Sequence, residues 1–131
     1  MKHTEFILQR QVCTYLRLQY PNVLFSSDFV SHLKLTNEQK TRNASIQKRG
    51  FHAPDLTIFS PRGGYHALFI ELKTKTPFKK DGTLLQNKHL ENQEGTIKKL
   101  RDIGYFVDFK WTLEDAIKLI DWYLKLDANE V

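Results

Sequence analysis

The sequence contains a single cysteine, Cys13, which excludes an internal disulfide and any zinc site built on paired cysteines. We expect Cys13 to be a small buried residue on a helix. No apolar run approaches the ~18 residues that a membrane span requires. The opening residues, MKHTEFILQRQVC, carry charges among their apolar positions and have no small-residue cleavage site, unlike a signal peptide. We therefore expect a cytoplasmic protein with no membrane contact.

The chain also lacks the short motifs of several enzyme classes. Its five histidines form neither an HExxH pattern nor a pair four residues apart, so we expect no zinc site. The GxSxG, Walker and GxGxxG motifs are absent as well. Acyl transfer, nucleotide hydrolysis and dinucleotide binding therefore have no support, and we expect no nucleotide cofactor.

Clustered positive charge is what the chain does have. The net charge is +5 over 131 residues, a length that favours one domain spanning residues 1–131. Between residues 34 and 50 a single acid, Glu38, stands among several basic residues, and a second basic cluster follows residue 72. This distribution favours a polyanionic partner without requiring one. The two clusters are Lys34, Lys40, Arg42, Lys48 and Arg49, and then Lys73, Lys75, Lys79 and Lys80.

Apolar residues at helical spacing predict three helices. We expect them over 4–19 with Thr4 as N-cap, over 87–104, and over 112–126 with Thr112 as N-cap. The helix over 87–104 is predicted to bury one stripe, which consists of Leu90, Ile97, Leu100 and Ile103.

Alternating apolar and polar residues predict short strands between these helices. The stretch 31–50 is polar and basic, and we expect it to be partly helical and closed by Gly50. The order of elements indicates an α/β fold with a central mixed β-sheet flanked by α-helices. The predicted strands are 23–27, 54–60, 65–75 and 105–109.

The strands over 54–60 and 65–75 are joined by residues that favour a tight turn. A three-residue loop, Arg62-Gly63-Gly64, would place Asp55 directly across from Glu71 on the same face of the hairpin. Alternation would continue that charged face through Lys73 and Lys75. The opposite face would enter the core through Leu68, Ile70 and Leu72.

Two carboxylates side by side need a positive partner. Like charges ~4 Å apart repel by about 4 kcal/mol at an effective dielectric of 20. Mg²⁺ prefers carboxylate oxygens together with water and phosphate oxygens, and Lys73 lies close by to hold or activate an attacking water. The alternative is a solvated strand face in which Asp55, Glu71 and Lys73 form an internal salt bridge.

The residues Pro54-Asp55 and Glu71-Leu72-Lys73 resemble the motif of the PD-(D/E)xK nuclease superfamily. The surrounding chain, over roughly residues 50–124, is similar to a stand-alone VRR-NUC domain of the phage type. One departure is Ala53, where the family often has Gly. The resemblance implies a restriction-endonuclease-like core, a single nuclease domain and hydrolysis of phosphodiester bonds.

The resemblance also implies roles for individual residues. Asp55 and Glu71 correspond to the family's ligands for Mg²⁺, for which Mn²⁺ substitutes, and the main-chain carbonyl of Leu72 corresponds to a third ligand. Lys73 corresponds to the lysine that serves the attacking water.

Gln93 and Glu5 complete the set of candidate site residues. Gln93 corresponds to a glutamine that the family carries on the helix after this strand, and it also interrupts an apolar stripe. Glu5 resembles an acid that many of these nucleases place on their first helix near the metal. A Glu in the first turn of any helix is also stabilised by the helix dipole, so both explanations stay open for Glu5.

Together these features predict a Mg²⁺-dependent DNA endonuclease. The resemblance further implies a homodimer that acts on branched or four-way-junction (Holliday) DNA in a bacterial or phage-infected cell. Two alternatives remain: a non-catalytic nucleic-acid-binding protein on the same fold, and a restriction-like or exonucleolytic nuclease. We expect phosphate contacts from Lys48, Arg49, Lys75, Lys79 and Lys80.

Overall fold

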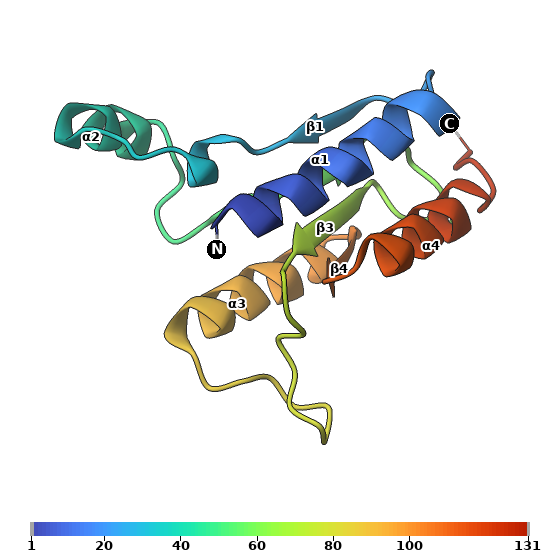
Figure 1. Ribbon diagram of the computed structural model, residues 1–131. Helices are drawn as coiled ribbons and strands as arrows, with labels where there is room; N and C mark the ends of the chain where they lie inside the picture. The colour runs from blue at the N-terminus through green and yellow to red at the C-terminus, as the bar shows by residue number, and fades with distance from the viewer. Residues whose placement is uncertain (1, 131) are drawn as a thin grey trace.

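The computed structural model describes residues 2–130 and is built around a four-stranded sheet with strand order β1-β2-β3-β4 (Figure 1). The first three strands are antiparallel neighbours, and β4 runs parallel to β3. This confirms the expected mixed sheet, although the first three strands are shorter than predicted and the fourth is shifted by one residue. They are β1 (Phe25–Ser27), β2 (Leu56–Ile58), β3 (Leu68–Leu72) and β4 (Phe106–Lys110).

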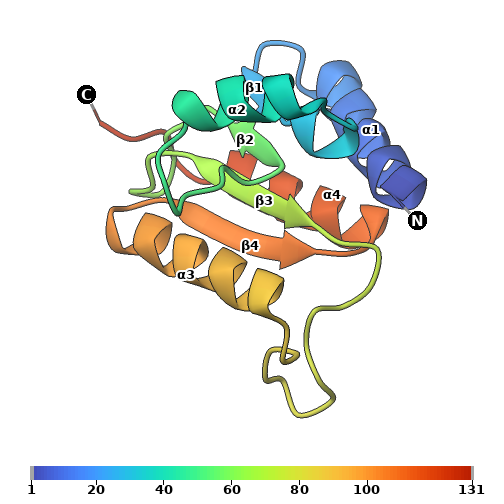
Figure 2. The ribbon, with the colours of Figure 1, turned by 90° about the vertical axis from the view of Figure 1, so that its left-hand side faces the viewer.

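Helices cover both faces of the sheet (Figure 2). On one face α1 (Lys2–Gln19) and α4 (Leu113–Leu124) enclose the larger core, to which Leu16, Leu56 and Ile120 belong. On the other face α3 (Lys88–Asp102) packs over a smaller core. Cys13 is buried on α1 as expected. No helix within residues 2–130 has the length and hydrophobicity that crossing a membrane requires.

The predicted helix start is right for α4 and wrong for α1. Thr112 caps α4, because its side chain accepts a hydrogen bond from the Asp115 amide. The structure begins α1 at Lys2, so Thr4 lies inside the helix and is not its N-cap. On α3, Ile103 does not join the buried stripe but is 63% exposed, because the helix has already ended at Asp102.

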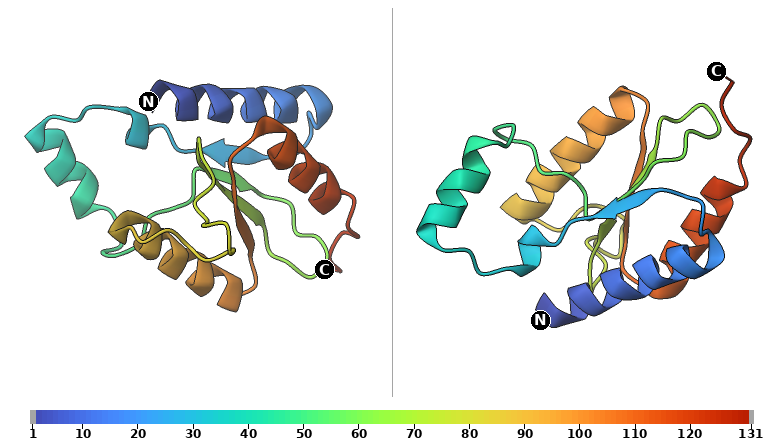
Figure 3. Two further views of the ribbon diagram at one scale, coloured as in Figure 1. Left: turned by 60° about the horizontal axis from the view of Figure 1, so that its bottom comes forward. Right: turned by 90° about the horizontal axis from the view of Figure 1, so that it is seen from above.

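The basic stretch after β1 forms an arm that stands away from the sheet (Figure 3). A short 3-10 turn, η1 (Val30–His32), leads into α2 (Asn37–Ser45), and none of the residues of α2 is buried. The helix ends well before Gly50, so the prediction that Gly50 closes it is wrong. We call residues 33–50 the arm.

The arm is held by local interactions. Thr36 and Gln39 form a reciprocal capping box at the start of α2, which satisfies amides that the helix itself leaves without partners. An exposed ion pair joins Arg42 to Glu38 across one helical turn at 3.2 Å.

The register between β2 and β3 is the predicted one, with Leu56 across from Ile70 and Ile58 across from Leu68. The predicted turn is wrong: Arg62 pairs with Tyr65 around a two-residue loop, Gly63-Gly64, in which both glycines have positive φ. An extra residue on the first side of the hairpin compensates for the shorter loop. Three residues separate Ile58 from Arg62, whereas two separate Tyr65 from Leu68.

The two faces of β3 differ from the prediction in one respect. Leu68, Ile70 and Leu72 enter the larger core, as expected. The opposite face is not a charged surface, because Phe69 packs there against the smaller core beneath α3. The strand ends at Leu72, so Lys73 and Lys75 do not continue that face as strand residues.

Candidate functional site

Asp55 and Glu71 lie together where β2 begins and β3 ends. Asp55 directly precedes β2, and its Oδ2 accepts a hydrogen bond from the Leu72 amide at 2.8 Å. The side chain of Glu71 is hydrogen-bonded to Asp55, and Glu71 is only 8% exposed. The hairpin therefore brings the two carboxyl groups side by side, as its register predicts. We call Asp55 and Glu71 the carboxylate pair.

The pKa of Glu71 is raised by its surroundings in the carboxylate pair. Burial, then the charge of Asp55 and the hydrogen bond to it, raise the pKa of Glu71 from 4.5 to about 10, against the smaller opposing effect of Lys73. Without a cation, Glu71 therefore holds a proton at neutral pH. A site that takes up a proton this readily is one where positive charge is strongly stabilised.

The backbone of Asp55 is fixed by two residues from other elements. Its carbonyl oxygen accepts hydrogen bonds from the Asp28 amide at 2.8 Å and from Gln9 Nε2 at 3.3 Å. Gln9 Nε2 also donates to the Asp28 carbonyl at 2.7 Å. Because Gln9 lies on α1, these bonds tie the first helix to the start of β2.

Gln9 is a site residue that the sequence interpretation missed. It is 5% exposed, it bonds the Ser27 hydroxyl, and its Oε1 lies 2.6 Å from His32 Nε2. The sequence could have predicted that Gln9 is buried, because it lies directly beside the buried stripe of Leu8 and Val12. A buried amide in that position needs several partners, and partners of that kind cluster at functional sites.

Gln93 supplies an amide oxygen that has no partner. Its Oε1 is buried and makes no hydrogen bond within residues 2–130. Gln93 belongs to α3, the helix that covers the face of β3 on which Phe69 and Glu71 lie. A buried oxygen without a donor costs about 1–3 kcal/mol, so a bound cation, water or substrate is a fitting partner.

Lys73 stays close to the carboxylate pair although it lies beyond the end of β3. Its amide donates to the Lys110 carbonyl at 2.9 Å, which extends the pairing of β3 with β4 by one residue. The Lys73 side chain is half-buried, and its charge lowers the pKa of Glu71.

The carboxylate pair offers oxygen donors that suit one hard divalent cation. Within residues 2–130 no three His, Cys, Asp or Glu side chains are grouped so as to hold a metal. Two adjacent carboxyl groups are oxygen donors that Mg²⁺ accepts together with water. Glu5 is half-buried on α1 and is near enough to raise the pKa of Glu71, but it does not form a three-carboxylate group with the pair.

The basic residues predicted to contact DNA lie in two exposed segments. Lys48 and Arg49 belong to the arm. The other three belong to the loop that leaves the carboxyl end of β3 and extends away from the sheet before α3 (Figure 2). That loop is closed by a bridge between Phe78 and Leu84, and its three lysines are Lys75, Lys79 and Lys80.

One solved structure, described as a VRR_NUC domain protein, is similar to this chain with a TM-score of 0.61. The likeness covers 97% of this chain and 93% of that chain, at 23% sequence identity. It shows a shared fold, in agreement with the expected restriction-endonuclease-like core. Neither a protein-family model nor a curated protein sequence matches the chain.

Proposed function

We propose that the protein is a metal-dependent nuclease that hydrolyses phosphodiester bonds in DNA. The observation that carries the proposal is the carboxylate pair, in which a buried Glu71 meets Asp55 at the end of β3 with its pKa raised to about 10. Such a shift, produced by burial and a like charge, is typical of functional sites. The fold shared with a VRR_NUC domain protein supports the same conclusion.

In this proposal Asp55 and Glu71, with the main-chain carbonyl of Leu72, hold a Mg²⁺ or Mn²⁺ ion. When bound, the cation stabilises the negative charge that develops on the phosphate oxygens. Glu71 gives up its proton on binding, because a nearby positive charge favours the ionised carboxylate. The hydrogen bond from the Leu72 amide keeps Asp55 in place beside Glu71.

Lys73 and Gln93 act on the attacking water. Lys73 Nζ donates a hydrogen bond to this water and holds it in place for attack on phosphorus. The bond between phosphorus and the leaving oxygen breaks, and the proton that the water loses passes through solvent to that oxygen. The buried Oε1 of Gln93 accepts a hydrogen bond from the same water and orients it toward phosphorus, which supplies the partner that this oxygen otherwise lacks. In this proposal Glu5, whose charge acts on Glu71, would hold a further water near the cation.

The exposed lysines and arginine of the two basic segments contact the DNA backbone. Contacts of this kind position a substrate without reading its sequence. Endonucleolytic action on branched or four-way-junction DNA, by a homodimer, is part of the proposal on the strength of the motif resemblance.

The test is cleavage of supercoiled, linear, single-stranded and four-way-junction DNA with Mg²⁺, Mn²⁺ or EDTA. We expect cleavage with either metal, none with EDTA, and none by Lys73→Ala. Lys118→Ala is the matched control, because Lys118 is an exposed lysine on α4 in an ion pair with Glu114. DNA that binds but stays uncut in every metal condition would favour the non-catalytic alternative and contradict the proposal.

A further inference from the structure

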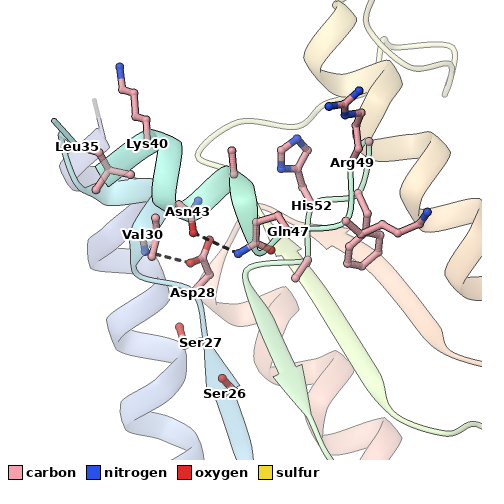
Figure 4. Close-up of a pocket in the computed structure, with 15 residues that line it drawn as sticks. Ser26, Ser27, Asp28, Val30, Leu35, Lys40, Asn43, Gln47, Arg49 and His52 are labelled. Carbon is pink, nitrogen blue, oxygen red and sulfur yellow. Dashed lines mark hydrogen bonds between the residues drawn. The ribbon is translucent and has the colours of Figure 1, made fainter. Parts of the chain in front are cut away.

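A cavity lies outside the carboxylate pair, between the arm and the end of β1 (Figure 4). It has a volume of about 730 Å³, within the range of sites that bind small organic groups. Its lining runs from Ser26 and Ser27 on β1 to Ala53, two residues before Asp55. We call it the arm cavity.

Polar side chains with unused hydrogen-bonding groups meet inside the arm cavity. Figure 4 shows Asp28, Asn43 and Gln47 gathered at its centre. Asn43 Oδ1 accepts from Gln47 Nε2 at 3.2 Å, and Asp28 Oδ1 accepts from the Val30 amide at 3.0 Å. No other side-chain hydrogen bond within residues 2–130 engages the Asn43 amide group or Gln47 Oε1. Paired donors and acceptors of this kind recognise the edge of a nucleobase.

An aromatic ring also lines the arm cavity. Phe51 is half-buried, packs against the smaller core and contributes to the cavity wall. A ring fixed in this way offers a stacking surface, and every nucleobase has a π-face that stacks on such a ring.

Positive charge surrounds the polar interior. Lys40, Lys48 and Arg49 belong to the lining, and His52 joins them on the loop side (Figure 4). Asp28 is the one acid among the lining residues. This excess of positive over negative charge suits a group that carries a phosphate on either side, as a nucleotide within a DNA strand does.

The arm cavity adjoins the carboxylate pair through a shared hydrogen bond. Asp28 lines the cavity with its side chain, while its amide donates to the Asp55 carbonyl at 2.8 Å. Asp28 therefore links the wall of the cavity to the backbone of the carboxylate pair.

We propose that the arm cavity binds one unpaired nucleobase of the DNA strand, stacked on Phe51 and hydrogen-bonded by Asn43 and Gln47. The inference rests on the proposed nuclease function and specifies its substrate class. DNA with an unpaired nucleotide beside the cleaved bond is preferred over perfect duplex, because an unpaired base can enter the cavity whereas a paired base stays in its stack and gains nothing from the cavity.

The test compares a duplex that carries a single-nucleotide bulge with the same duplex without it. We expect wild type to cleave the bulged DNA with a kcat/KM about tenfold or more above that for the perfect duplex, a factor that one stacked base can supply. Gln47→Ala combined with Asn43→Ala, and separately Phe51→Leu, should bring this ratio close to one. Cleavage of the perfect duplex should change by less than about twofold.

Gln11→Ala serves as the matched control, because Gln11 is an exposed glutamine on α1 that lines a different groove. Thermal unfolding checks that each variant is folded. Equal cleavage of both DNAs by wild type, or a preference that survives both variants, would overturn the inference. If the variants change the mass of the protein in solution and leave the preference intact, the cavity is an interface between copies and the inference is wrong.

Two different measurements distinguish a failure of the nuclease proposal from a failure of the proposed base-binding cavity. Absence of metal-dependent cleavage of any DNA by wild type contradicts the nuclease proposal alone. Binding of the same two DNAs in EDTA then tests the arm cavity. A preference for the bulged DNA that the variants remove supports it, and equal binding overturns it.

Discussion

The carboxylate pair and the arm differ in how the chain holds them. Asp55 and Glu71 are fixed by the strand register and by hydrogen bonds from Gln9 and Asp28. The arm contributes no buried residue from α2 and relies on a capping box and an exposed ion pair. Groups that take part in chemistry need fixed geometry, whereas a segment that grips a substrate gains from being able to adjust. Substitutions should therefore have distinct effects in the two regions.

The largest effect is expected from Lys73→Ala. Removing a group that serves the attacking water should lower kcat by about 100- to 10,000-fold, with little change in thermal stability because the side chain is only half-buried. Single-turnover cleavage kinetics measure the loss. Lys48→Ala, in the arm, should instead weaken DNA binding and its salt dependence while kcat stays within about threefold. Equal losses of kcat in both variants would contradict the proposed difference between the carboxylate pair and the arm.

Gln9→Leu should destabilise the whole protein. The substitution removes the donor to the carbonyls of Asp28 and Asp55 and the partner of His32, and each buried group left alone costs about 1–3 kcal/mol. We expect a loss of about 3 kcal/mol in the free energy of unfolding, measured by urea denaturation, together with reduced cleavage. In the arm, Gln47→Ala is the matched change and should leave the free energy of unfolding within ~0.5 kcal/mol.

Glu71 should make the stability of the metal-free protein depend on pH. Its pKa is raised from 4.5 to about 10 in the folded state, so between these values the folded protein binds more protons than the unfolded chain. Stability contributed by this proton is fully present below pH 4.5 and is lost as the pH rises toward 10.

The variant Glu71→Gln removes this titration and should be more stable than wild type at pH 8 in EDTA, by about 1–3 kcal/mol. Thermal unfolding across this pH range, in wild type and variant, measures the difference. Parallel stability curves for the two proteins would contradict the protonated state of Glu71.

The smallest effect is expected from Thr36→Ala. Loss of the capping hydroxyl should destabilise α2 locally by about 1 kcal/mol and should barely change global unfolding, because none of the residues of α2 is buried. Hydrogen exchange should show faster exchange of the Gln39 amide, which Thr36 caps, and unchanged protection in β3. A matching drop in global stability would mean that the arm folds with the sheet.

The carboxylate pair could be predicted because strand pairing is a local rule. The alternation in β3 and the motif residues led to the correct register even though the assumed turn was wrong, since an extra residue before Arg62 offsets the shorter loop. Register follows mainly from which side chains must be buried, and Ile58, Leu68 and Ile70 all enter the core.

Features that depend on distant packing could not be predicted in the same way. Burial of Glu71 depends on how other elements pack around the end of β3, and the role of Gln9 requires β1 and η1 to meet α1. The partly helical character of the arm was predicted, but its lack of packing was not, because the sequence does not show that none of the residues of α2 is buried. Ile103 was wrongly assigned to the buried stripe because helical periodicity does not indicate where a helix ends.

The most direct test of the carboxylate pair is calorimetric titration with Mn²⁺ at pH 7 in two buffers of different ionisation enthalpy. If the pair holds a cation, we expect one binding event that releases about one proton, since Glu71 must ionise to become a ligand. The variant Glu71→Gln should bind far more weakly and release no proton. Absence of binding to wild type, or equal binding and proton release in both proteins, would contradict a metal site at Asp55 and Glu71.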